Sequence, residues 1–125
     1  MDKERDWGLL VMRVVLGAVF IAHGWPKVMG IAGTISFFGN LGLPEFLAYV
    51  VAGVEVLGGA AMILGLWTQW AGRLLAVDML GAIYFVKWPR GFVGGYEFEL
   101  ALLALALGLS LVGPGSLTIR KLLKK

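Results

Sequence analysis

The sequence contains no cysteine and a single histidine, and charged residues occupy only 15% of its 125 positions. The absence of cysteine excludes disulfides, thiolate nucleophiles and cysteine-ligated zinc or iron–sulfur sites. A single histidine excludes haem ligation by two histidines. Soluble domains carry about 25% charged residues. A water-soluble fold with this composition would therefore expose more apolar surface than soluble proteins tolerate.

Hydrophobic residues make up 59% of the chain, and the mean hydropathy is +0.85. A helix needs about 20 mainly apolar residues to cross a hydrocarbon layer about 30 Å thick. Four stretches are close to this length, at about 7–29, 44–66, 69–88 and 96–112. The sequence therefore predicts an all-α fold, a transmembrane four-helix bundle with short connections. We expect residues 1–125 to form one membrane domain with no separate soluble domain.

The connections between these stretches are short. Residues 33–43 are too few and too polar to cross, and their apolar positions predict a short amphipathic helix lying flat at the membrane surface. A tight connection is expected around Trp67 and Thr68. The run Gly113-Pro114-Gly115 is a strong helix breaker and is expected to end the fourth stretch.

The distribution of basic residues predicts the orientation, because cytoplasmic loops are enriched in lysine and arginine. With four crossings, both termini share one side with the 66–73 connection. That side carries Lys3, Arg5, Arg73, Arg120, Lys121, Lys124 and Lys125. The other side carries only Lys27, Lys87 and Arg90. We therefore expect both termini in the cytoplasm. The basic tail at 116–125 is expected to lie beside anionic lipid headgroups and to bind no nucleic acid.

Seven ionisable residues lie within these stretches or at their ends, and a charge at mid-span costs about 2.5–3.5 kcal/mol. They are Arg13, His23, Lys27, Glu55, Asp78, Glu97 and Glu99. At a rise of about 1.5 Å per residue, Glu55 and Asp78 fall near the middle of the membrane. His23 and Lys27 fall in its outer third, and Arg13 falls in its inner third.

These depths predict which charges meet. We expect an outer cluster in which His23 and Lys27 lie beside Glu97 or Glu99, with Glu55 facing the cluster from below. The two glutamates that open the fourth stretch are also compatible with solvated end charges, favoured there by the helix dipole.

On the inner side, Arg13 or Arg73 is expected to pair with Asp78. Ion pairs inside a bundle can fix how helices dock, or they can carry out chemistry, and the sequence leaves both interpretations open.

Small residues indicate close helix packing. They are Gly53, Gly58, Gly59 and Ala60 around Glu55, the pair Gly72-x-x-x-Ala76 and the pair Ala104-x-x-x-Gly108.

Several short motifs follow one another along the chain. In order they are Arg13, Gly17, His23-Gly24-x-x-Lys27, Gly42-Leu43-Pro44, Glu55-x-x-Gly58-Gly59, Gly65, Arg73, Gly91-Phe92 and Gly94-Gly95-Tyr96-Glu97. Together they resemble the DoxX/DoxD family of small four-helix bacterial membrane proteins over nearly the whole chain. Members of that family are associated with membrane redox systems, including a thiosulfate:quinone oxidoreductase subunit. The resemblance implies a multi-pass protein of the bacterial inner membrane.

The leading functional hypothesis is a subunit of a membrane redox complex that binds a quinone or a similar apolar redox molecule. Its partner would be another membrane or peripheral redox protein, and no covalent cofactor or metal is expected. The candidate catalytic residues are His23 and Lys27, which would hydrogen-bond a quinone carbonyl, and Glu55, which would exchange protons. Further candidates for binding the molecule are Arg13, Phe20, Trp25, Asp78, Trp88 and Glu97.

Two other functions are compatible with the same residues. The chain could be a non-catalytic accessory subunit that stabilises a larger membrane complex. A proton or small-solute conduit through Arg13, Asp78 and Glu55 is the third hypothesis, and it is less favoured because one chain supplies only four helices. The sequence leaves open whether the chain is an enzyme and whether it forms a homo-oligomer.

Overall fold

The computed structural model describes residues 2–123, and all the regular structure in this range is helical. The helices are α1 (Asp2–Met29), α2 (Ile31–Asn40), α3 (Glu45–Leu64), α4 (Thr68–Ala82), α5 (Glu97–Val112) and α6 (Ile119–Leu123). Between α4 and α5 the chain forms a π-helical turn (Ile83–Lys87), a 3-10 turn (Trp88–Arg90) and a kinked turn (Phe92–Tyr96). The all-α prediction is confirmed. Lys124 and Lys125 of the predicted basic tail lie outside the described residues.

Three segments are long and apolar enough to cross a membrane, namely Asp2–Met29, Glu45–Leu64 and Phe92–Val112. They coincide with three of the four predicted stretches. The first helix begins earlier than predicted, because Asp2 and Glu4 in its first turn interact favourably with the helix dipole. The predicted third stretch, 69–88, is divided between the 15-residue α4 and the irregular turns that follow it. Four membrane crossings therefore remain a prediction.

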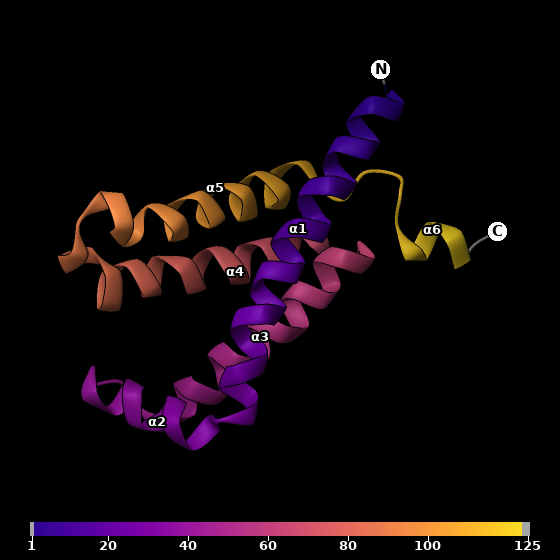
Figure 1. Ribbon diagram of the computed structural model, residues 1–125. Helices are drawn as coiled ribbons and strands as arrows, with labels where there is room; N and C mark the ends of the chain where they lie inside the picture. Colours follow the sequence, from indigo (N-terminus) through magenta and orange to yellow (C-terminus); the bar gives the residue numbers. More distant parts are fainter. Residues whose placement is uncertain (1, 124–125) are drawn as a thin grey trace.

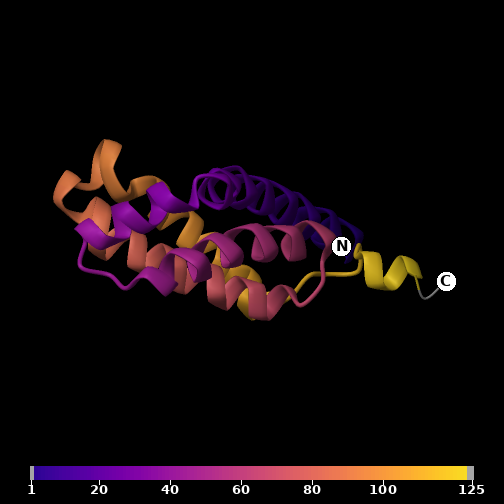
Figure 2. The same cartoon turned by 90° about the horizontal axis from the view of Figure 1, so that it is seen from below.

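The long helices form two pairs (Figure 1). Helix α1 packs along α3, α4 packs along α5, and the first pair crosses the second obliquely. The N-terminus and α6 lie at one end of the bundle, whereas α2 and the turns between α4 and α5 lie at the other (Figure 2). Buried side chains from all four helices, including Leu16, Met62, Leu75 and Leu109, form the core between the pairs. The short helix expected within 33–43 is α2, which packs mainly on α3.

Glycines determine how closely the two helices of each pair approach. A Cβ on Gly59 of α3 would lie 2.7 Å from the carbonyl oxygen of Gly17 on α1, so the two backbones touch at this point. In the second pair, Gly72 of α4 packs against the backbone of Ala106 on α5. The predicted Ala104-x-x-x-Gly108 contact is wrong, because both residues are exposed. A different face of α5, containing Ala106, meets α4.

Arg13 and Asp6 of α1 form hydrogen bonds that stabilise the end of the bundle where α6 lies. The guanidinium of Arg13 is fully buried, and it donates hydrogen bonds to the carbonyl oxygens of Met62 and Leu117. Gly65 ends α3 beside it in the left-handed conformation (φ +74°), and a side chain there would collide with Arg13. Asp6 accepts a hydrogen bond from the amide of Ser116 at 3.1 Å.

The substitution Gly59→Ala tests the close approach of α1 and α3. The added methyl group would overlap the carbonyl of Gly17, so we expect stability to fall by about 1–3 kcal/mol. Gly53→Ala is the matched control on the same helix, because no atom lies within 4 Å of its Cβ position. Thermal unfolding in detergent, followed by circular dichroism, measures both variants. Equal unfolding midpoints for the two variants would contradict the contact.

Candidate functional site

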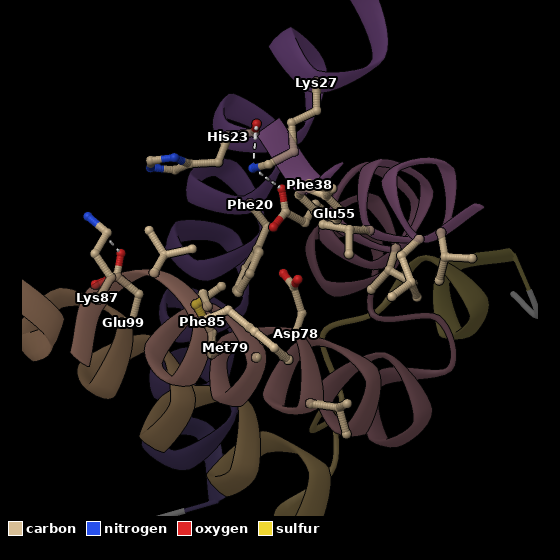
Figure 3. Close-up of a pocket in the computed structure, with 18 of the residues that line it drawn as sticks. Phe20, His23, Lys27, Phe38, Glu55, Asp78, Met79, Phe85, Lys87 and Glu99 are labelled. Atoms are coloured by element: carbon tan, nitrogen blue, oxygen red, sulfur yellow. Dashed lines mark hydrogen bonds and ion pairs between the residues drawn. The ribbon is translucent and has the colours of Figure 1, made fainter. Parts of the chain in front are cut away.

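A cavity of about 550 Å³ lies between α1, α2, α3, α4 and the start of α5. Its walls are mostly aliphatic and aromatic side chains. The phenylalanines come from four different segments and are Phe20, Phe37, Phe38, Phe85 and Phe98. Figure 3 shows part of this lining together with its charged residues, which are His23, Lys27, Glu55, Asp78, Lys87 and Glu99. A largely apolar pocket with a few converging polar groups is typical of small-molecule sites.

The shortest ion pair of the cavity joins Lys27 to Glu55. The ammonium nitrogen of Lys27 lies 2.7 Å from Oε1 of Glu55, and it also donates a hydrogen bond to the carbonyl of His23 at 3.2 Å. The pair forms here because Gly24, one turn before Lys27, lets α3 approach α1. A Cβ on Gly24 would lie 2.7 Å from the Cβ of Glu55. The glutamate side chain is 4% exposed and the lysine 30%, so the carboxylate is the buried partner.

Asp78 lies on the opposite wall, on α4, with its carboxyl group pointing toward Glu55 (Figure 3). Its Oδ2 atom is buried and has no hydrogen-bond partner among the described residues. Within residues 2–123, Asp78 pairs with neither Arg13 nor Arg73, so the predicted pairing is wrong. Arg13 binds backbone carbonyls at the other end of the bundle, and Arg73 lies over the ring of Trp70 at 4.8 Å. Neither arginine lines the cavity.

A second polar group lies where the turn after α4 meets α5. The ammonium of Lys87 lies 3.6 Å from Oε2 of Glu99, and Oε1 of Glu99 is buried without a hydrogen-bond partner in the described chain. His23 is exposed at the edge of the cavity, with its ring 5.8 Å from that of Phe98. The expected cluster is found in part: His23, Lys27 and Glu99 line the same cavity as Glu55, and Glu97 does not. Within it, Lys27 forms its ion pair with Glu55, and Glu99 forms one with Lys87.

The predicted site residues divide into two groups. His23, Lys27 and Glu55, the catalytic candidates, line the cavity, as do Phe20 and Asp78. The other four binding candidates lie outside its lining, and they are Arg13, Trp25, Trp88 and Glu97.

The residues outside the lining have other contacts. The ring of Trp88 stacks on that of Tyr96 at 5.2 Å, and Trp25 is exposed. Glu97 accepts a hydrogen bond from the amide of Gly94 at 2.8 Å and so stabilises the turn before α5.

Lys87 was not among the expected site residues, and Glu99 was expected either in the outer cluster or as a solvated end charge. Glu99 is 8% exposed and is not a solvated end charge. Helical periodicity could have predicted that Glu99 is buried. It lies three residues before Leu102 and four before Leu103, on the buried face of α5. The phenylalanines of α2 were also missed, since a helix expected to lie flat on the membrane surface offers no reason to face a cavity.

The chain is similar to several known membrane proteins. A family model described as DoxX matches residues 8–88. A Bacillus subtilis protein named "Putative oxidoreductase CatD" is 43% identical over 113 residues, which cover 90% of this chain and 84% of that protein. The Escherichia coli "Inner membrane protein YqjF" is 31% identical over 131 aligned positions, covering 100% of this chain and 98% of that protein. A second Escherichia coli protein, "Inner membrane protein YphA", is 36% identical over 75 residues, covering 58% of this chain and 54% of that protein. No solved structure matches the chain significantly.

The substitution Lys27→Met tests the buried ion pair. It leaves the Glu55 carboxylate without its cation, so we expect stability to fall by about 1–3 kcal/mol. The double variant Lys27→Met/Glu55→Gln should recover part of this loss, because it removes the buried charge as well. Lys87→Met is the control, with a smaller expected effect because its contact is longer, at 3.6 Å. Unfolding midpoints in detergent measure all three variants. A double variant less stable than Lys27→Met would refute the interpretation.

Proposed function

Since the chain belongs to the DoxX family and is a multi-pass protein of the bacterial inner membrane, we propose that its cavity binds a quinone or a similar apolar redox molecule. The chain would act as a subunit of a membrane redox complex. The observation that carries the proposal is a mainly apolar, phenylalanine-rich cavity with the Lys27–Glu55 ion pair and the Asp78 carboxyl in its walls.

The cavity fits such a molecule in size and in chemistry. Its volume of about 550 Å³ falls within the range of about 300–1,000 Å³ that is usual for ligand pockets. Phe20 and Phe38 are buried side chains of the lining and offer ring faces and edges against which a planar ring can pack. The charged groups provide hydrogen-bond donors and acceptors in a region that is otherwise apolar.

Each polar residue has a distinct part in this proposal. A bound quinone supplies the redox chemistry, since it takes up two electrons and two protons. Lys27 donates hydrogen bonds and can direct an N–H toward a carbonyl oxygen in the cavity. Glu55 holds the ammonium of Lys27 in place and can accept or release a proton. His23, at the exposed edge, connects this pair to the surface.

The electrons come from a redox centre in a partner protein. The chain has no cysteine, and residues 2–123 contain no cluster of histidine and acidic residues suited to hold a metal ion. The Bacillus subtilis relative is named as an oxidoreductase, which supports a redox role, and this chain would contribute the binding site and the proton-exchanging groups.

The arrangement in the membrane is part of the proposal. Four crossings, with both termini in the cytoplasm, would place the cavity toward the outer leaflet. The common position of the N-terminus and α6 at one end of the bundle supports this topology (Figures 1 and 2). The excess of basic residues on the segments at that end supports its cytoplasmic placement.

A matched pair of glycine substitutions tests ligand binding. Gly81 lines the cavity and Gly108 does not, and neither has an atom within 4 Å of its Cβ position. Gly81→Leu should reduce the space for the molecule and weaken binding of a short-chain benzoquinone by about tenfold or more, which corresponds to about 1.4 kcal/mol. Gly108→Leu should leave binding unchanged. Quenching of tryptophan fluorescence in detergent measures the affinity.

Two outcomes would count against the proposal. The first is an absence of saturable quinone binding by the wild-type protein. The second is an equal affinity of the two glycine variants for the quinone, with both folded by circular dichroism. Stable co-purification with a larger membrane enzyme, without quinone binding, would instead favour the non-catalytic accessory subunit.

A further inference from the structure

Asp78 has the one carboxyl group in the cavity wall that takes part in no ion pair within residues 2–123. Its Oδ2 atom is buried and accepts no hydrogen bond from residues 2–123. Its charged neighbours are Glu55 and Lys27. In Figure 3 the carboxyl points into the cavity toward Glu55, whose own oxygen already contacts Lys27.

The carboxyl groups around Asp78 outnumber the cations. Lys27 from α1 is a single cation, and it faces two carboxyl groups, Glu55 from α3 and Asp78 from α4. Lys87 from the turn after α4 is paired with Glu99 from α5, and His23 lies at the exposed edge. Helix α2, which also lines the cavity, contains no charged residue. Among residues 2–123, the cavity lining therefore offers Asp78 no second lysine or arginine without an acidic partner.

Two neighbouring carboxylates with one cation are costly in an apolar cavity. An ionised carboxyl without a partner loses its hydration, and a second negative charge nearby repels it. A proton on one of the two carboxyl groups removes both costs. Glu55 already forms an ion pair with Lys27, whose ammonium nitrogen lies 2.7 Å from Oε1 of Glu55. Asp78 has no such contact, so the proton belongs on Asp78.

We propose that Asp78 and Glu55 together hold one proton, which Asp78 carries, so that the cavity presents a carboxylic acid O–H beside the Lys27–Glu55 pair. A neutral Asp78 can donate a hydrogen bond, as an ionised one cannot. Together with the N–H groups of Lys27, it favours molecules that bring an acceptor oxygen, such as the carbonyl of an oxidised quinone. This statement about the ligand rests on the proposed function, whereas the proton on Asp78 does not.

Infrared difference spectroscopy of the protein in lipid vesicles at neutral pH, without added quinone, tests the proton directly. A protonated carboxyl has a C=O stretching band separate from the carboxylate bands. We expect this band in the wild type and its loss in Asp78→Asn. Glu99→Gln is the matched control, because Glu99 also has a buried oxygen without a partner, and it should keep the band.

A second variant tests the charge count. Lys27→Met removes the one cation that faces the two carboxyl groups, so the absorption of protonated carboxyl groups should not fall below that of the wild type. The proposal is overturned if the wild type lacks the band, if the band persists in Asp78→Asn, or if Glu99→Gln abolishes it. Since Asp78→Asn replaces one neutral polar side chain with another of similar size, this variant should remain folded even where Lys27→Met is destabilised.

Binding of the short-chain benzoquinone then tests the role of the donor. Asp78→Leu removes it and should weaken binding by about tenfold, equivalent to about 1.4 kcal/mol, whereas Asp78→Asn retains N–H donors and should weaken it less. Equal losses in both variants would contradict the donor role. Absence of quinone binding together with a clear C=O band would refute the proposed function and leave the proton on Asp78 in place. Quinone binding without the C=O band would refute the proton on Asp78 and leave the proposed function in place.

Discussion

The close contact between the backbones of α1 and α3 is the constraint on which the rest of the structure depends. Gly17 and Gly59 let the two helices touch, and Gly24, about two turns further along α1, extends the contact to Glu55. Only at this separation can Lys27 reach the buried carboxylate at 2.7 Å. The same glycines that allow tight packing therefore bring a polar pair into an apolar interior. Larger side chains at these positions would separate the helices and leave Glu55 without its cation.

The second pair of helices, α4 and α5, forms the wall of the cavity opposite α1 and α3. Because α4 and α5 cross the first pair obliquely, the two pairs separate toward one end, and α2 folds back to cover the space that remains (Figure 1). Phe37 and Phe38 of α2 thus become part of the cavity lining. Crossing pairs meet closely near the middle and diverge away from it, so this geometry places a cavity at one end and a packed core beside it.

The all-α fold and the approximate extent of the long helices could be predicted, because hydropathy and helix breakers depend on local composition. The depth of each charge along its helix followed from the rise per residue, and His23, Lys27 and Glu55 do line one cavity. The predicted pairing of Asp78 with an arginine was wrong, and which glutamate pairs with Lys27 was not predicted. Rotation of each helix about its axis, and the angle between the two pairs, decide whether Lys27 meets Glu55 or Glu99. Those quantities depend on contacts such as Gly24 against Glu55, which no single stretch of sequence reveals.

The hydrogen bond from Arg13 to the carbonyl of Leu117 joins residues 104 positions apart. A ribosome synthesises the first helix long before it reaches Leu117, so the guanidinium enters the translocation machinery without this acceptor. Water, lipid phosphates or a chaperone surface must solvate the arginine until α5 and the segment after it have been made. The hydrogen bonding of Arg13 is therefore completed only after Leu117 has been synthesised, when the segment after α5 covers this end of the bundle.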